Sequence, residues 1–324
     1  MTVMINQDSR RLMAPSPPKT TAVVVNWNAK PFLRSCIEAL LDAQPQDLEI
    51  LVVDNGSTDG SLDTLVEFGD RIRIIETGQN LGFGTGINLG VNSSRSHYVL
   101  VLNPDVVLDS ESIPELVKYL DVNPTVGVVG PRLLDESGRT TASCGKAPNI
   151  VAEVCRKFLL HLVLPFLKFG RQRPTMPKKM GWVTGACFLV RRKATESVGG
   201  FDEAIFMYYE DVDFCLRLQS VGWDVAYLPQ ATGRHSGGGS SRQVLEKMLL
   251  VSESSYRIMI RRHLGKQAVR LLNWLTPVEM RIRTLMWQVV SLILPNLRSE
   301  AQQRIHAYRR IMFDYSSIDA GGVR

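Results

Sequence analysis

The stretch AVVVNWN (22–28) decides the fold class, because a short β-branched apolar run that ends in polar residues is typical of a buried strand. Similar apolar runs recur at 48–53, 72–76 and 98–102, and segments with helical apolar spacing separate them. Strands that alternate with helices in this way predict an α/β fold with an open, mostly parallel sheet flanked by helices.

Helices are expected between these strands, the first opened by Pro31 and the others at 61–68, 85–93 and 110–120. Further along the chain, the same patterns predict strands at 182–191 and 224–227 and a helix at 211–219.

The chain divides into three parts. Residues 1–20 are expected to form a loose leader, and residues 21–240 one α/β domain with halves at 21–130 and 131–240. Residues 241–324 carry apolar residues threaded among arginines, which predicts a C-terminal extension of two or three amphipathic helices.

The composition is that of a globular protein. Of the 324 residues, 44% are hydrophobic and 22% are charged, which argues against disorder, a collagen-like repeat and a disulfide scaffold. The five cysteines are dispersed and none forms a CxxC pair, which argues against structural zinc and favours a reducing compartment. There is no secretory signal, and no run of about 18 apolar residues that could span a membrane. We therefore expect a cytoplasmic protein.

Basic residues gather in two places, although the formal net charge is only +6. The band 156–195 contains ten Lys or Arg residues and no acidic residue, and the part from Arg242 onward is rich in arginine. Such regions bind anionic lipid, nucleic acid or an anionic substrate, or are simply solvated surface. No RNA- or DNA-binding motif accompanies them, so nucleic acid is not an expected partner. The extension also offers apolar residues for a membrane interface: Leu285, Met286, Trp287, Val290, Leu292 and Leu294.

Polar clusters follow all four N-terminal strands. They are Asn26–Asn28, Asp54–Gly60, Asn80–Gly84 and Asn103–Asp105. Because ligands of open α/β sheets bind at the carboxyl ends of the strands, these clusters predict one shared site. Glycines at 82, 84 and 86 lack the spacing of a dinucleotide fingerprint and follow the third strand, which argues against a Rossmann site.

Asp105 and Asp54 have two interpretations each. Pro104 should end the fourth strand, which places Asn103 and Asp105 at its edge, where a carboxylate and an amide oxygen suit Mg²⁺ or Mn²⁺. Alternatively, Asp105 is a turn residue that caps the next helix. Asp54 could accept hydrogen bonds from a base or ribose, or could form an ordinary Asx-turn with Asn55 and Gly56.

A second constellation is YYEDVDFCLR (208–217), with three carboxylates within four residues. On a helix, Glu210 and Asp213 share a face and Asp211 points away from both. Like charges this close raise one another's pKa, which favours a proton-accepting role, although acidic capping of a helix explains them as well. His235 follows in a glycine-rich stretch, where it could complete a metal site with Asp105 or simply be exposed.

Taken in order, these motifs resemble the family 2 glycosyltransferases with the GT-A fold, and by eye the bacterial rhamnosyltransferase-like branch. The matching segments are VVVNWN (23–28), VVDNGSTDGS (52–61), NLGFGTGINLG (80–90), LNPDV (102–106), GWVTGACFLVRR (181–192), GGFDEAIFMYYEDVDFCLRL (199–218) and the region around His235. The resemblance covers about residues 20–240 and leaves the C-terminal extension uncovered.

The resemblance implies roles for individual residues. Asp105 matches the last residue of the family's Asp-x-Asp metal motif, whose first position is Asn103 here, and His235 matches the histidine that closes the metal site. Asp211 matches the general base, the second residue of a Glu-Asp pair. The nucleotide-sugar pocket would include Asn26, Asp54, Asn80, Gly82 and Asn103, and the wall between donor and acceptor Trp182, Thr184, Gly185 and Glu210.

The resemblance also implies the reaction. It predicts an inverting, metal-dependent transfer of a sugar, with dTDP-rhamnose as the expected donor and UDP- or GDP-sugars as alternatives. The expected acceptor is a saccharide or a polyprenyl-diphosphate-linked sugar of cell-surface polysaccharide, which suits peripheral contact with the inner face of the plasma membrane. The alternative from another class is a non-catalytic, nucleotide-sugar-binding assembly protein on the same fold.

Overall fold

The computed structural model describes residues 18–43, 47–160, 170–237 and 245–313. The expected leader therefore lies almost wholly outside the described residues. The main sheet has the strand order β3-β2-β1-β4-β11-β6-β12-β5, and β9 pairs with β12 beside this path. Its strands are β1 (Thr20–Asn26), β2 (Leu48–Asp54), β3 (Arg73–Glu76), β4 (Tyr98–Leu102), β5 (Val106–Leu108), β6 (Val126–Leu134), β9 (Lys178–Lys179), β11 (Cys187–Arg191) and β12 (Asp224–His235).

The four N-terminal strands pair in parallel, as expected for an α/β sheet. Strand β11 then runs antiparallel to both β4 and β6, and β12 returns parallel to β6. The sheet is therefore mixed but mostly parallel, which confirms the predicted fold. In the parallel register Asn26 lies opposite Asp54, so the polar residues that end β1 and β2 meet at one edge.

Alternate residues of each strand point to opposite faces of the sheet, and helices cover both faces. Ala22 and Val24 belong to one core and Val23 and Val25 to the other. The first core includes α1 (Lys30–Asp42), α3 (Ser112–Val122) and the 3₁₀ helix η1 (Leu62–Arg71). The second core includes α2 (Phe83–Asn92), α6 (Arg192–Ser197) and α7 (Glu210–Ser220).

Two predicted strands differ in the structure. The expected strand 182–191 is two strands: β10 (Trp182–Val183) joins a small sheet with β7 (Cys144–Gly145) and β8 (Arg171–Gln172), whereas β11 joins the main sheet. In the turn between them, the Gly185 N–H donates to the Asp211 carboxylate of α7 and not to a neighbouring strand. The strand expected at 224–227 continues to His235, which pairs with Val106 and is therefore not in a loop.

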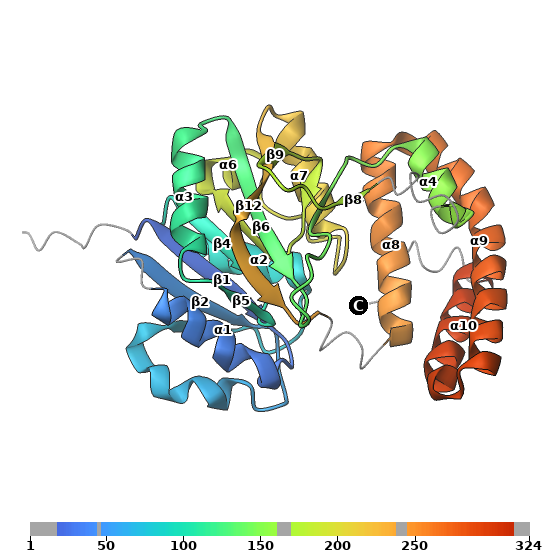
Figure 1. Cartoon of the computed structure of the whole chain (residues 1–324), viewed down its shortest axis with the longest axis horizontal. Coiled ribbons are helices and arrows are strands. Elements are labelled where there is room, and N and C mark those ends of the chain that lie inside the picture. The colour runs from blue at the N-terminus through green and yellow to red at the C-terminus, as the bar shows by residue number, and fades with distance from the viewer. Residues whose placement is uncertain (1–17, 44–46, 161–169, 238–244, 314–324) are drawn as a thin grey trace, which may run out of the picture.

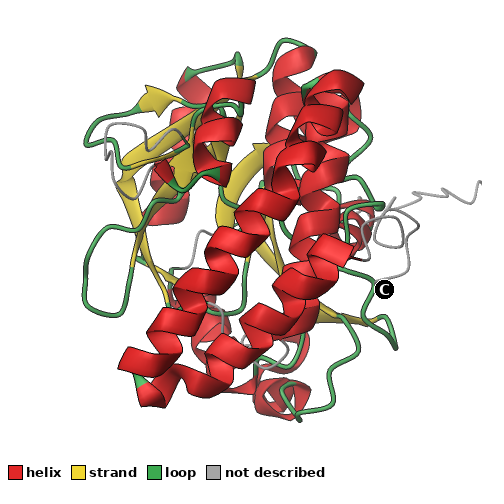
Figure 2. Cartoon of the chain, turned by 90° about the vertical axis from the view of Figure 1, so that its right-hand side faces the viewer, coloured by secondary structure: helices red, strands yellow, loops and turns green. Residues whose placement is uncertain are grey.

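The C-terminal part forms a second, helical layer beside the sheet (Figures 1 and 2). It contains α8 (Leu245–His263), α9 (Gly265–Ile293), the short η4 (Pro295–Leu297) and α10 (Arg298–Phe313). Helix α4 (Ile150–Lys157) packs against α9 in this layer, although it comes from the middle of the chain. The prediction of two or three helices is confirmed. No helix in the described part of the chain is long and apolar enough to cross a bilayer.

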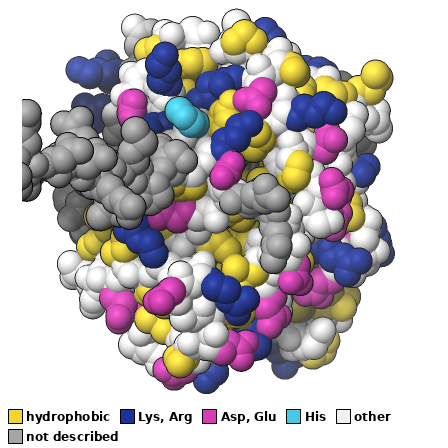
Figure 3. Space-filling model, turned by 90° about the vertical axis from the view of Figure 1, so that its left-hand side faces the viewer, with side chains coloured by type: hydrophobic (Ala, Val, Ile, Leu, Met, Phe, Trp, Pro, Cys, Tyr) yellow, Lys and Arg dark blue, Asp and Glu magenta, His cyan; other side chains and the backbone are white. Residues whose placement is uncertain are grey.

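The basic band is not one surface, which corrects the simplest interpretation of its charge. The Lys157 Nζ lies 2.8 Å from a Glu279 oxygen, and both side chains are almost fully buried. Arg191 and Arg192 are partly buried and donate to the backbone carbonyls of Val126 and Ser96. On the face of the molecule opposite the helical layer, charged side chains of both signs are interspersed (Figure 3).

Candidate active site

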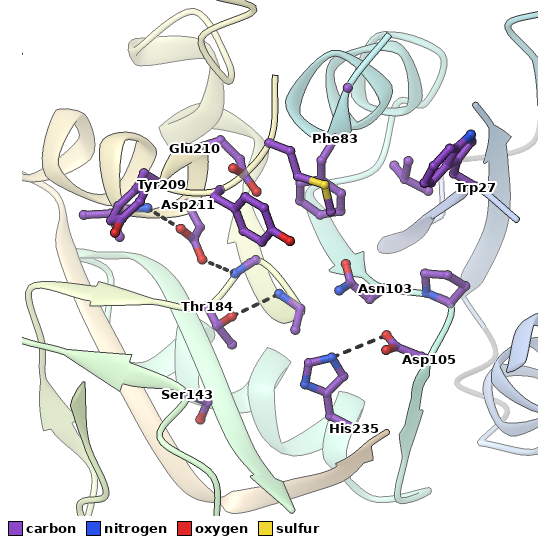
Figure 4. A pocket seen from close by; sticks show the side chains of 18 of the residues that line it. Trp27, Phe83, Asn103, Asp105, Ser143, Thr184, Tyr209, Glu210, Asp211 and His235 are labelled. Atoms are coloured by element: carbon purple, nitrogen blue, oxygen red, sulfur yellow. Dashed lines mark hydrogen bonds and ion pairs between the residues drawn. The ribbon is translucent and has the colours of Figure 1, made fainter. Parts of the chain in front are cut away.

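A cleft of about 690 Å³ opens at the carboxyl edge of the N-terminal strands. It collects residues from both halves of the α/β domain and from α8. Ten predicted residues line it: Asn80, Gly82, Asn103, Asp105, Trp182, Thr184, Gly185, Glu210, Asp211 and His235. Figure 4 shows Asp211 and the pair Asp105–His235 on different sides of this space, with Asn103 on the side of Asp105.

Asn26 and Asp54 do not line the cleft in this structure, and their contact with a nucleotide stays a prediction. Both side chains are buried, and the Asn26 amide donates to Asp54 at 2.7 Å. The same amide donates to Ser57 and Ser61, and the other Asp54 oxygen accepts from the Ser57 backbone N–H. These hydrogen bonds tie the loop after β2 to the buried end of β1.

The loop residue that reaches the cleft is Asn55, which the sequence analysis did not single out. Its amide donates to the Gly82 carbonyl at 3.0 Å and its oxygen accepts from the Leu81 N–H. Gly82 has φ +89°, and a Cβ there would lie 2.4 Å from the Phe206 carbonyl oxygen. Only glycine fits this position, so the second half of the domain can approach the Asn80–Gly82 turn closely.

Asp105 and His235 stand where β4 and β12 end. The His235 Nε2 lies 3.4 Å from the Asp105 Oδ1, and both side chains are mostly buried. A carboxylate, an imidazole and the nearby Asn103 amide oxygen are donors that suit Mg²⁺ or Mn²⁺. Among the described residues no group of three or more His, Cys, Asp or Glu side chains could hold a metal. The residues fit a cation that shares its remaining positions with a substrate.

Asp211 is held at the start of α7 by backbone donors. Its Oδ2 accepts from the Gly185 N–H at 2.8 Å and its Oδ1 from the Val212 N–H at 2.7 Å. Burial raises the pKa of Asp211, although both N–H groups and the charge of Arg171 act in the opposite direction. A raised pKa brings a carboxylate closer to what a general base needs at neutral pH.

Glu210 lies beside Asp211 and faces the same cleft (Figure 4). Its side chain is buried, and its Oε2 has no hydrogen-bond partner among the described residues. Burial, helped by the charge of Asp211, raises the pKa of Glu210 from 4.5 to about 8. The expected effect of a neighbouring acid is therefore present at Glu210.

Asp213 does not line the cleft, whereas Glu210 and Asp211 both do, which corrects the prediction that Glu210 and Asp213 share a helix face from which Asp211 points away. Glu210 is the first residue of α7 and turns into the cleft, whereas Asp213 points toward α8. Its fully buried carboxylate contacts Arg217, Arg262 and His263. Burial alone would raise the pKa of Asp213, but hydrogen bonds from His263 and Arg217 lower it.

The residues before Glu210 have strained backbone. Tyr208 and Tyr209 have φ of 67° and 63°, left-handed values that cost non-glycine residues of order 1–3 kcal/mol each. Helix α8 supports this turn: the Ser255 hydroxyl donates to the Met207 carbonyl at 2.7 Å, and the Tyr256 ring packs 5.5 Å from the Tyr209 ring. The C-terminal layer thus holds the strained loop that presents Glu210 and Asp211.

Aromatic and helical wall residues were missed by the sequence analysis: Trp27, Phe83, Phe206, Tyr208, Tyr209 and Ser252. Trp27 follows Asn26, and the two tyrosines directly precede Glu210. Their positions beside predicted site residues could have identified them as wall residues. Ser252 carries no such signal, because α8 reaches the cleft only through tertiary packing.

The fold and cleft define a glycosyltransferase of the GT-A type, and the comparisons with known proteins agree. The profile of glycosyl transferase family 2 matches residues 21–199. The N-acetylglucosaminyl-diphospho-decaprenol L-rhamnosyltransferase of Mycobacterium tuberculosis is 33% identical over 264 residues, which cover 75% of this chain and 84% of that protein. The rhamnosyltransferase WbbL of Escherichia coli K12 is 24% identical over 259 residues, covering 75% of this chain and 93% of that protein.

The chain therefore belongs to glycosyl transferase family 2 and is an enzyme of the rhamnosyltransferase-like group. Among solved structures, the mannosyltransferase of Pyrobaculum calidifontis in complex with GDP-Man and Mn²⁺ matches with a TM-score of 0.56 and 16% identity, covering 93% of this chain and 88% of that one. At this identity the match concerns the fold.

Proposed function

We propose that this enzyme is an inverting, divalent-cation-dependent rhamnosyltransferase that takes dTDP-rhamnose as donor. Its acceptor, we propose, is a sugar carried on a polyprenyl diphosphate in cell-surface polysaccharide synthesis, as the mycobacterial relative's name describes for that protein. The observation that carries the proposal is the arrangement of the cleft, in which Asp211 stands across from Asp105 and His235 (Figure 4).

The donor side of the reaction belongs to Asp105, His235 and the Asn80–Gly82 turn. Asp105 and His235 would hold Mg²⁺ or Mn²⁺, which when bound neutralises charge that grows on the departing diphosphate. Asn103 and the turn would orient the nucleotide sugar, and Asn26 and Asp54 would act indirectly, by fixing the loop that carries Asn55.

The acceptor side belongs to Asp211, which would take the proton of the attacking hydroxyl. The two backbone N–H donors hold its carboxylate toward the cleft, while Glu210 and Trp182 form the wall around the reacting sugar. A single base opposite the leaving group favours one displacement at the anomeric carbon, which inverts its configuration. Positioned proton transfer of this kind contributes roughly 10²- to 10⁴-fold to rate.

The proposal also places the enzyme at the inner face of the plasma membrane. Five cysteines without a disulfide, four of them buried, suit a reducing compartment. Apolar side chains on the outer face of α9, including Trp274, Leu285 and Leu292, are well exposed and suit an interfacial position.

A donor panel tests the core of the proposal. We expect dTDP-rhamnose to raise the thermal midpoint in the presence of Mn²⁺ or Mg²⁺ more than UDP- or GDP-sugars do, because a ligand that binds only the folded state stabilises it. Transfer to farnesyl-diphospho-N-acetylglucosamine should then release dTDP. Equal shifts with all donors, with and without cation, would contradict the donor and metal assignments.

A further inference from the structure

We propose that Arg171 is the residue that recognises the diphosphate of the acceptor, and that it makes the enzyme selective for acceptors carried on a lipid diphosphate. This inference rests on the proposed function and identifies the diphosphate as the part of the acceptor that the cleft recognises. Arg171 lies in β8, the outer strand of the small sheet, and lines the cleft.

The charges of the cleft argue for this role. Three carboxyl groups line it, those of Asp105, Glu210 and Asp211, and the charged forms of Asp105 and Asp211 would repel an anionic acceptor. Arg171 carries the single ammonium or guanidinium group among the described residues that line the cleft. An acceptor with a diphosphate therefore has one cationic partner available there besides a bound metal ion.

The position of Arg171 assigns it to the acceptor side. Its strand pairs with β7, where Arg171 lies opposite Gly145, and β7 pairs in turn with β10, where Gly145 lies opposite Trp182. This sheet stands on the side of Asp211, whose carboxylate feels the charge of Arg171. The proposed donor diphosphate belongs instead at Asp105 and His235, which end β4 and β12.

The Arg171 side chain is free to bind. It is exposed, and no ion pair joins it to an acidic residue in the part of the chain that the structure describes. A guanidinium presents parallel N–H donors that match phosphate oxygens in pairs, which an ammonium cannot do.

The test compares an acceptor that carries a diphosphate with one that carries no phosphate. The full-length chain and its Arg171→Gln variant would be assayed with farnesyl-diphospho-N-acetylglucosamine and with octyl N-acetylglucosaminide, which has no phosphate. We expect Arg171→Gln to raise KM for the diphosphate acceptor roughly tenfold to a hundredfold, as for loss of a charged hydrogen bond. The KM for the neutral acceptor and for the donor should stay unchanged, and Arg171→Lys should lie between.

Arg173 supplies the matched control, because it is an exposed arginine two residues on that does not line the cleft. Arg173→Gln should leave all three KM values unchanged. An equal rise for both acceptors, a rise for the donor, or no rise at all would overturn the inference while wild-type transfer leaves the proposed function intact. If the wild type transfers sugar to neither acceptor, the proposed function fails and the inference falls with it.

Discussion

Asp211 and its neighbour Glu210 differ in their hydrogen-bond partners, although both carboxyl groups are buried. Asp211 accepts two backbone N–H bonds, so its charged form has partners, whereas Glu210 has an oxygen without one. Charge is therefore more costly at Glu210, which agrees with the proposal that Asp211, and not Glu210, is the base.

Replacing Asp211 by Asn tests the base. We expect Asp211→Asn to lower kcat by roughly 10²- to 10⁴-fold, because the amide cannot accept the proton of the acceptor hydroxyl. The thermal shift caused by the donor should persist, since Asp211 lies across the cleft from Asp105 and His235, where we propose that the diphosphate binds. Asp70→Asn, at an exposed aspartate outside the cleft, is the control and should retain full turnover. Substantial residual kcat in Asp211→Asn would place the base elsewhere.

The raised pKa of Glu210 makes stability depend on pH. A carboxyl whose folded-state pKa is about 8 and whose ordinary value is 4.5 contributes stability below pH 4.5, which is lost as pH rises to about 8. Glu210→Gln should therefore unfold at higher urea concentration than the wild type at pH 9. The gain should exceed about 1.4 kcal/mol, the equivalent of one pKa unit, and should disappear near pH 4.

Glu136→Gln controls for the loss of one acidic charge, because Glu136 is exposed and does not line the cleft. Its urea midpoint should match the wild type at both pH values. A Glu210→Gln effect that is the same at pH 4 and pH 9 would show that packing, and not ionisation, controls the stability of this site.

At the scale of elements, close approach between the two halves of the domain depends on Gly82. An added Cβ would meet the Phe206 carbonyl at 2.4 Å, so Gly82→Ala must push the Asn80–Gly82 turn away from the loop that carries Tyr208. We expect KM for the donor to rise about tenfold or more, together with a loss of order 1–3 kcal/mol in the free energy of unfolding.

Gly69→Ala separates backbone strain from close approach. Gly69 also has a positive φ, +49°, but an added Cβ there would meet nothing within 4 Å. This variant should lose some stability without a change in the KM for the donor, as measured by steady-state kinetics. If Gly82→Ala bound the donor as well as Gly69→Ala does, the approach would have no role in binding.

A buried charge cluster joins α7 to α8. Asp213 is fully buried among Arg217, Arg262 and His263, so removing its charge leaves several cationic groups without their carboxylate. Asp213→Asn should lower the free energy of unfolding by about 3–5 kcal/mol, as measured by chemical denaturation. Asp202→Asn, at a carboxylate that contacts Arg262 alone in this cluster, should cost less. Equal losses would contradict a central role for Asp213.

The sequence predicted the parallel half of the sheet well because each strand there is a continuous apolar run with its own polar end. It could not predict the turn at Thr184–Ala186, because β10 and β11 lie in one apolar stretch and only distant partners separate them. The same reason explains which residues of the cleft could be predicted. Residues at strand ends were predictable from local order, whereas Ser252 and Arg171 reach the cleft through packing of remote segments.

At the scale of the whole molecule, the helical layer presents an apolar outer surface. Trp274, Leu285 and Leu292 are 75%, 62% and 75% exposed, and Arg270 and Arg281 lie on the same side of α9. This combination favours adsorption to an anionic bilayer. The double variant Trp274→Gln, Leu292→Gln should bind phosphatidylglycerol vesicles about tenfold more weakly in a flotation assay.

Val66→Gln is the matched control, because Val66 is 78% exposed but lies on η1, in the main domain. It should float with vesicles as the wild type does, and raised salt should weaken binding of both proteins. Binding that survives the double variant, or wild-type binding that ignores salt, would remove α9 from the membrane contact.

The pairing of Lys157 with Glu279 has a consequence for anyone who builds chimaeras of this enzyme with its relatives. Glu279 sits in α9 and Lys157 in α4, more than a hundred positions earlier, with both side chains sealed from solvent. Exchanging 245–313 alone would leave Lys157 buried without an ion-pair partner, unless the new helices carry an acidic residue at the position of Glu279. The segment 150–157 therefore has to be exchanged together with 245–313. A hybrid that is joined at a single crossover between them is expected to misfold.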